Sequence, residues 1–174
     1  MLIVPKILSS SQNNKEIFLY PGDLYFGQAP DRVRTLLGSC VAITLWHPRR
    51  HLGGMCHYML RNPKEVDPVH LNGRYAEDAV LFFLQQLKHY KTPVQQYQVK
   101  IFGGGNMFPN TLGRTKNNIG QQNMRVGRAL LRTHGFQVES EHLGGLGHRR
   151  IIFDLKTGQV LVHHTQNSYA DRKL

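Results

Sequence analysis

Apolar and polar positions along this chain follow the period of a β-strand in some segments and that of a helix in others. The clearest strand is the β-branched, apolar run Val41–Trp46, and His51–Leu60 follows it after a turn at residues 47–50 that contains Pro48. Runs of this kind, bounded by turn residues, are typical of strands. We therefore expect the two segments to pair as antiparallel neighbours, with Val41–Trp46 buried in a sheet.

Two segments have helical spacing. Within Tyr75–Tyr90 the apolar residues recur three or four positions apart, which places them on one helix face. These residues are Val80, Phe83, Leu84 and Leu87. A second helix is predicted over Ile119–His134, with Asn118 as its N-cap and Gly135 as its C-terminal stop.

Five further segments have the composition of strands. They are Ile17–Tyr20, Gln98–Phe102, Phe136–Leu143, Arg150–Leu155 and Gln159–His164. Two helices inserted between groups of strands predict an α/β fold, a single-domain layered α/β sandwich with mixed, largely antiparallel sheets. The polar start predicts a flexible N-terminal extension over residues 1–16, with the folded domain spanning residues 17–174.

The charge of the chain is positive and unevenly distributed. The 174 residues include 22 Lys and Arg against 11 Asp and Glu, a net charge of +11. Residues 1–87 contain 9 basic and 7 acidic side chains, whereas residues 88–174 contain 13 and 4. Such a field attracts an anionic partner, either nucleic acid or an acidic protein surface. No nucleic-acid motif is present, so we expect the helix-face residues Arg125, Arg128 and Arg132 to meet an acidic stretch of a protein.

Composition also limits the compartment and the cofactors. No apolar run approaches the about 18 residues needed to span a membrane, so no membrane insertion is expected. The scarcity of cysteine, two residues in all, is typical of a reducing compartment, and we expect the protein to be cytoplasmic. No Cys-x-x-Cys or His-Glu-x-x-His spacing predicts a metal ion, and Gly103–Gly105 lacks the pattern of a phosphate-binding loop.

A thiol and an imidazole are predicted to meet beside the turn. If the two strands pair about a centre between residues 48 and 49, Cys40 lies opposite His57. A histidine that takes the proton of a cysteine activates it as a nucleophile, and the Cys40 backbone N–H is a candidate donor to an oxyanion. The alternative is that both residues are ordinary parts of the core. Cys56 competes with Cys40, but strand alternation turns it away from His57, which favours a core position over a disulfide with Cys40.

Five motifs in order support a family resemblance. They are Leu37-Gly38-Ser39-Cys40-Val41-Ala42, His57 seventeen positions after the cysteine, Gly103-Gly104-Gly105-Asn106-Met107-Phe108, Asn118-Ile119-Gly120-Gln121-Gln122-Asn123, and Gly144-Gly145 before Arg149. Together they resemble the CheD family, the bacterial chemoreceptor glutamine deamidases. The resemblance extends from about Gly22 to Val162.

The resemblance implies a set of catalytic residues. Cys40 would be the nucleophile, His57 the base and Thr35 the third member. Because Thr35 lies five positions before Cys40, the two would face opposite sides of an unbroken strand. Either a bulge at Gly38 restores the geometry or Ser39 orients the histidine instead.

The resemblance also implies substrates and partners. Residues Gly103–Phe108 and Asn118–Asn123 would border the cleft, and the substrate-binding candidates are Ser39, Gly104, Gly105, Asn106 and Arg149. For Arg149 a solvated charge at a strand end is an equally good interpretation. The implied reaction converts glutamine to glutamate in the cytoplasmic domain of a methyl-accepting chemotaxis protein, without a cofactor. A CheC-type phosphatase is an implied partner, and a docking module without catalysis is the alternative function.

Overall fold

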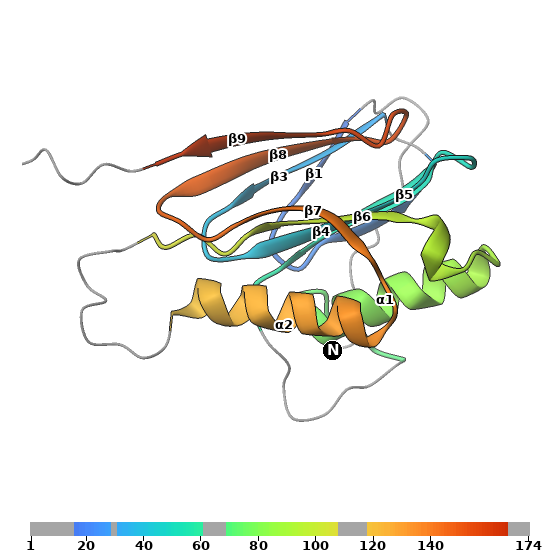
Figure 1. Cartoon of the computed structure of the whole chain (residues 1–174), viewed down its shortest axis with the longest axis horizontal. Coiled ribbons are helices and arrows are strands. Elements are labelled where there is room, and N and C mark those ends of the chain that lie inside the picture. Colours follow the sequence, from blue (N-terminus) through green and yellow to red (C-terminus); the bar gives the residue numbers. More distant parts are fainter. Residues whose placement is uncertain (1–15, 29–30, 61–68, 108–117, 167–174) are drawn as a thin grey trace, which may run out of the picture.

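The computed structural model describes residues 16–28, 31–60, 69–107 and 118–166 (Figure 1). In chain order the elements are β1 (Glu16–Leu19), β2 (Leu24–Gly27), β3 (Arg32–Leu37), β4 (Val41–His47), β5 (Leu52–Tyr58), α1 (Ala76–His89), the 3-10 helix η1 (Val94–Gln96), β6 (Gln98–Gly103), α2 (Ile119–Thr133), β7 (Val138–Leu143), β8 (His148–Asp154) and β9 (Val160–Thr165). Residues 1–15 of the predicted extension and Phe108 of the predicted cleft border lie outside the described residues.

The elements form three layers. One sheet has the strand order β1-β3-β8-β9, and the other has the order β2-β5-β4-β6-β7. Figure 1 shows the two sheets stacked, with α1 and α2 on the other face of the five-stranded sheet. The pairs β1–β3 and β6–β7 are parallel and the remaining pairs are antiparallel. The predicted α/β sandwich with mixed, largely antiparallel sheets is confirmed.

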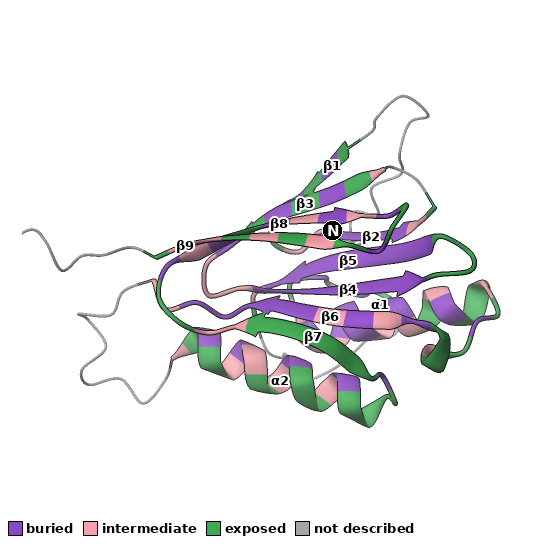
Figure 2. Cartoon of the chain, turned by 45° about the horizontal axis from the view of Figure 1, so that its top comes forward, coloured by how far each residue is buried: buried purple, intermediate pink, exposed green. Residues whose placement is uncertain are grey.

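Two hydrophobic cores lie on the two faces of the five-stranded sheet. One core, between that sheet and the helices, includes Ile43 of β4 and Phe83 of α1. The other core, between the two sheets, includes Ala42 of β4 and Phe153 of β8. Because both faces are covered, β4 and β5 are buried along their whole length (Figure 2). This double burial explains why the Val41–Trp46 run is apolar at nearly every position rather than at every second one.

Both predicted helices are present in the structure, but two of its strands were not predicted. The Asn118 side chain accepts a hydrogen bond from the Gln121 N–H over 3.1 Å and so caps α2 as expected. Strands β2 and β3 were not predicted, although β3 alternates between exposed and buried positions along its length. The inward positions of β3 are Val33, Thr35 and Leu37. No helix within the described ranges is both long and apolar enough to cross a membrane.

The register of the β4–β5 hairpin differs from the prediction by two positions. His57 pairs with Ala42, not with Cys40, and His47 pairs with Leu52. The centre of the turn therefore lies one residue later than expected, within a four-residue connection that ends at His51. His51 has a positive φ of 49°, a conformation that closes such a turn and that the hydrophobic pattern does not encode.

Candidate active site

Thr35 and His57 meet in the core between the two sheets. Thr35 points inward from β3 in one sheet, and His57 points inward from β5 in the other. The Thr35 hydroxyl oxygen Oγ1 lies 2.7 Å from His57 Nδ1, and the same hydroxyl donates to the Leu19 carbonyl over 2.7 Å. A hydroxyl has only one proton, so Thr35 accepts the bond from His57. The proton of the neutral ring is therefore on Nδ1, and Nε2 keeps its lone pair.

The surroundings of His57 hold the ring in its neutral form. The residue is only 2% exposed, and within the described part of the chain its Nε2 atom has no hydrogen-bond partner. Burial lowers the pKa of His57 to about 4, and the Leu19 carbonyl raises it by a smaller amount. The result is a buried, neutral imidazole with one unoccupied acceptor nitrogen, which is the form needed to receive a proton from a thiol.

Cys40 lies just before β4, near the position that faces His57. Ala42 is directly opposite His57. Cys40 is two positions before Ala42, and its side chain is half-buried against the core between the sheets, to which Ala42 also belongs. Burial raises the pKa of its thiol, while its own backbone N–H lowers it by less, so the resting pair is a neutral thiol and a neutral imidazole.

The chain crosses from one sheet to the other between Thr35 and Cys40. Strand β3 ends at Leu37 in the four-stranded sheet, and β4 begins at Val41 in the five-stranded sheet. An odd separation places two residues on opposite sides only within one continuous strand, and Thr35 and Cys40 are not in one strand. No bulge at Gly38 is therefore needed for Thr35 to contact His57. For Ser39, the alternative orienting residue, the structure gives a backbone contact and no bond to His57 within the described residues.

Three consecutive carbonyl groups in this crossing segment are held by hydrogen bonds. The Gly105 N–H donates to the Gly38 carbonyl over 2.8 Å, and the Gly104 N–H donates to the Cys40 carbonyl over 2.8 Å. Between them, Asn123 Nδ2 donates to the Ser39 carbonyl over 3.1 Å. Gly104 and Gly105 thus contact the backbone on both sides of Ser39, next to Cys40. Their predicted contact with substrate stays a prediction.

Gly103 shows why a glycine is required at the end of β6. Its φ is +116°, and a Cβ at this position would lie 2.2 Å from the Cys40 carbonyl oxygen. Beyond it, the Asn106 N–H donates to the Gly145 carbonyl over 2.8 Å and joins this segment to the loop before β8. A substrate contact of Asn106 likewise stays a prediction.

The expectation that Arg149 is a solvated strand-end charge is wrong. Its side chain is only 1% exposed. Its Nε donates to His142 Nδ1 over 2.7 Å, and one of its terminal nitrogens donates to the Gly144 carbonyl. A Cβ on Gly105 would lie 3.3 Å from the other terminal nitrogen. Arg149 therefore lies against both glycine segments, where it supports the loops, and its contact with substrate stays a prediction.

Cys56 lies on the other side of the five-stranded sheet. It is fully buried in the core beneath the helices, and burial raises the pKa of its thiol to about 12. Both cysteines are free thiols. This position agrees with the expectation that Cys56 is a packing residue.

The basic face of α2 is partly neutralised within the chain. Arg128 forms a two-bond ion pair with Glu141 of β7, at 2.5 and 3.0 Å. The prediction that all three arginines meet an acidic partner is therefore weakened for Arg128. Arg125 and Arg132 are exposed.

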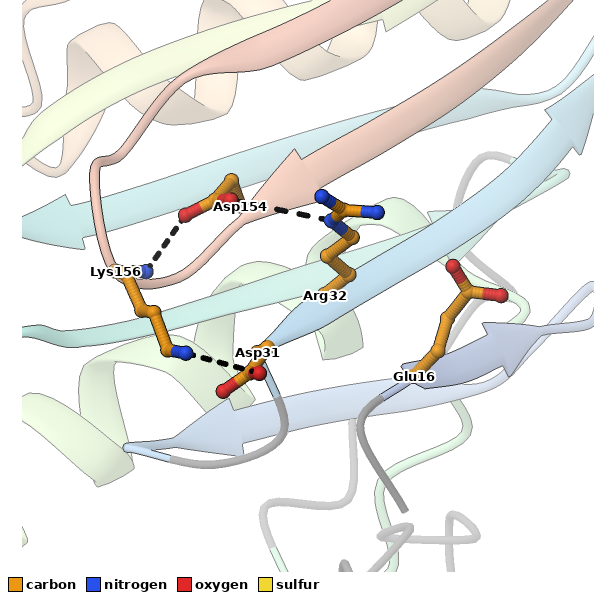
Figure 3. A pocket seen from close by; sticks show the side chains of 5 residues that line it. All are labelled: Glu16, Asp31, Arg32, Asp154 and Lys156. Carbon is orange, nitrogen blue, oxygen red and sulfur yellow. Dashed lines mark hydrogen bonds and ion pairs between the residues drawn. The ribbon is translucent and has the colours of Figure 1, made fainter.

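A separate pocket of 340 Å³ lies against the four-stranded sheet (Figure 3). Its lining residues are Glu16, Asp31, Arg32, Asp154 and Lys156. Lys156 pairs with Asp31 at 3.0 Å and Arg32 with Asp154 at 4.0 Å, so much of the charge in this pocket is neutralised locally. None of the predicted site residues lines it. Among the described residues, no group of three or more His, Cys, Asp or Glu is arranged to hold a metal ion.

Comparisons with known proteins show which proteins this chain is similar to. A family model described as CheD chemotactic sensory transduction matches residues 59–164. A protein of Dechloromonas aromatica named "Probable chemoreceptor glutamine deamidase CheD 3" is 43% identical over 156 residues, covering 90% of this chain and 91% of its own length. A "Probable chemoreceptor glutamine deamidase CheD" of Pseudomonas syringae pv. tomato is 43% identical over 150 residues, covering 86% and 89%. A solved structure, the Bacillus licheniformis hypothetical protein YfiH, aligns with 78% of this chain and 62% of its own, with 11% identity and a TM-score of 0.45.

Proposed function

The chain belongs to the CheD family, and we propose that it deamidates glutamine side chains of chemoreceptors with Cys40 as nucleophile and His57 as base. One observation supports this mechanism above the others. The Thr35 hydroxyl fixes the proton of His57 on Nδ1, which leaves a lone pair on the buried Nε2, next to the core against which Cys40 packs.

The first half of the reaction forms a thioester. His57 Nε2 takes the Sγ proton of Cys40 as the sulfur attacks the carboxamide carbon of the substrate. A C–S bond forms and one electron pair of the carbonyl moves to its oxygen. When the carbonyl re-forms, the C–N bond breaks, and the Nε2 proton passes to the nitrogen, which leaves as ammonia.

The second half releases glutamate. A water molecule gives a proton to Nε2 as its oxygen attacks the thioester carbon. The C–S bond then breaks, and the Nε2 proton returns to the Cys40 sulfur, so the enzyme ends as it began. The substrate has lost NH₃ and gained H₂O, and its side chain is a carboxylic acid.

The low pKa of His57 fits this cycle. An imidazolium in this buried position is a stronger acid than a free imidazolium, so it readily returns its proton to the departing nitrogen, whereas the neutral ring is a weaker base toward the thiol than a free imidazole. Thr35 accepts a hydrogen bond from Nδ1–H throughout and stabilises the positive charge while it exists. The site therefore generates charge only during the reaction and keeps none at rest.

The test is a deamidation assay on a purified chemoreceptor cytoplasmic fragment. Peptide mass spectrometry should show specific glutamines converted to glutamate by the wild-type protein. Cys40→Ala and His57→Ala should abolish the conversion. Cys56→Ala is the matched control and should retain it, because Cys56 is a thiol on the opposite face of the same sheet. Conversion that survives the Cys40→Ala change would refute the mechanism.

A docking role is the alternative, in which the chain binds a receptor or a CheC-type phosphatase without catalysis. The presence of both Cys40 and His57, with the imidazole ring held by Thr35, favours catalysis over docking alone. We propose the CheC-type partner as an addition to catalysis. A pull-down that retains the partner with the Cys40→Ala variant would support it. The deamidation reaction belongs in the cytoplasm, where the receptor domains that it modifies lie.

A further inference from the structure

Asn123 is a buried polar residue of α2 that the proposed reaction has not yet used. It is only 2% exposed. Its Nδ2 group donates to the Ser39 carbonyl over 3.1 Å and to the Met59 carbonyl over 3.0 Å. The Asn123 amide group therefore binds backbone carbonyls on both sides of the site. Ser39 is one residue before Cys40, and Met59 is two residues after His57.

The bond to Ser39 determines where the next N–H points. The Ser39 carbonyl and the Cys40 N–H belong to one planar peptide unit, and in a trans peptide they point in opposite directions. A donor that holds the Ser39 oxygen on the side of α2 directs the Cys40 N–H away from α2. The Cys40 side chain packs against the core between the two sheets, on the face of the five-stranded sheet away from α2, so this N–H lies on the side of the thiol.

The neighbouring peptide units are held differently. The Gly38 and Cys40 carbonyls accept bonds from the backbone N–H groups of Gly105 and Gly104. The peptide between Ser39 and Cys40 is the one unit of the three whose carbonyl is held by a side chain. Its orientation can therefore be changed by mutation without removing a backbone bond.

Contacts between α2 and β5 position Asn123 next to the Ser39 carbonyl. The Tyr58 hydroxyl donates to the Asn123 carbonyl over 2.8 Å and fixes this turn of α2 against β5. Gly127, one turn later, leaves room for the phenol, because a Cβ there would lie 2.2 Å from the Tyr58 oxygen. The Asn123 side chain is thus aimed at the crossing segment by buried, rigid contacts.

We propose that Asn123 is a positioning residue that fixes the Cys40 N–H as the donor to the oxyanion formed when the sulfur attacks the amide. This inference rests on the proposed function. A carbonyl that accepts a hydrogen bond also polarises its peptide unit, so the bond from Asn123 strengthens the same N–H as a donor. Both effects act on the transition state and not on substrate binding.

The test compares two reactions of the same sulfur in Asn123→Ala and Asn123→Asp. Deamidation of the receptor fragment passes through an oxyanion, whereas alkylation of Cys40 by iodoacetamide is a displacement at a saturated carbon that forms none. Loss of an oriented oxyanion donor should lower kcat for deamidation about 100-fold in both variants. KM and the alkylation rate at a fixed, mildly alkaline pH should each stay within about threefold of wild type.

Thr92→Val is the control for loss of a buried hydrogen bond. The Thr92 hydroxyl is buried against the Tyr97 hydroxyl at 2.8 Å, outside the site, so this variant should keep its kcat. Thermal melts identify the variants that fold. An Asn123 variant that folds and keeps kcat within about threefold of wild type would overturn the inference. A parallel fall in deamidation and alkylation would also overturn it, because Asn123 would then be purely structural. If the wild-type protein fails to deamidate, the proposed function itself is wrong.

Discussion

Acid should destabilise this protein through His57, and the size of the effect follows from its burial. In the folded chain the pKa of His57 is lowered to about 4, whereas an unfolded histidine titrates near about 6.5. Between these two values the unfolded state binds a proton that the native state does not. Stability from this group is therefore fully present above the unfolded pKa and is lost as the pH falls through the folded pKa. The loss is about 1.4 kcal/mol per pH unit, or about 2.5 kcal/mol between about pH 7.5 and about pH 4.5.

Urea denaturation of the wild type and of His57→Gln across this range measures the effect. Other groups titrate in both proteins, so the difference between the two stability curves isolates His57. The difference should change by about 2.5 kcal/mol over the range, with the wild type losing more stability than the variant. The His57 ring resonances in NMR spectra should titrate near about 4. Stability curves of the two proteins that stay parallel within about 0.5 kcal/mol would refute the assignment of a buried neutral ring. An NMR titration midpoint of His57 at about 6.5 would refute it as well.

Substitutions of Thr35, Gly103 and Arg149 test the contacts around the site, and two control variants accompany them. Thr35→Val should lower kcat at least about tenfold because the His57 Nδ1–H loses its acceptor. Thr35→Ser keeps the hydroxyl and should restore kcat. Equal kcat in both variants would contradict the proposed hydrogen bond. Gly103→Ala should cost about 3 kcal/mol or more of unfolding free energy because its Cβ meets a carbonyl oxygen. Gly135 also has a positive φ, but a Cβ there would lie 3.7 Å from Val94 Cγ2, so Gly135→Ala should cost only about 1 kcal/mol in the same denaturation assay. Arg149→Met should lower the unfolding free energy by about 2 kcal/mol through lost loop contacts, whereas a rise in KM at unchanged stability would identify a substrate contact instead.

The sequence could predict what depends on local periodicity. Strand β4 was evident from its apolar run, and α2 from its spacing together with the Asn118 cap. Alternation within β5 correctly turned Cys56 away from His57, because neighbouring side chains in a strand point to opposite faces. Five motifs in order, from the segment around Cys40 to Gly144-Gly145, indicated the family before any contact was known. Strand β3 was missed because it alternates over only six residues and two of its exposed positions are arginines, which gives a weak pattern.

Contacts between segments that are distant in sequence could not be predicted from the pattern and depend on the folded structure. The two-residue shift in the β4–β5 register depends on the backbone of the turn at His51, which hydrophobic pattern does not specify. The burial of Arg149 depends on loops that fold over it. The contact between Thr35 and His57 forms because the chain changes sheets between Leu37 and Val41, so the threonine approaches His57 from the opposite layer. Periodicity determines on which face of its own strand or helix a side chain lies. The packing of the layers determines which residues of another element that side chain contacts.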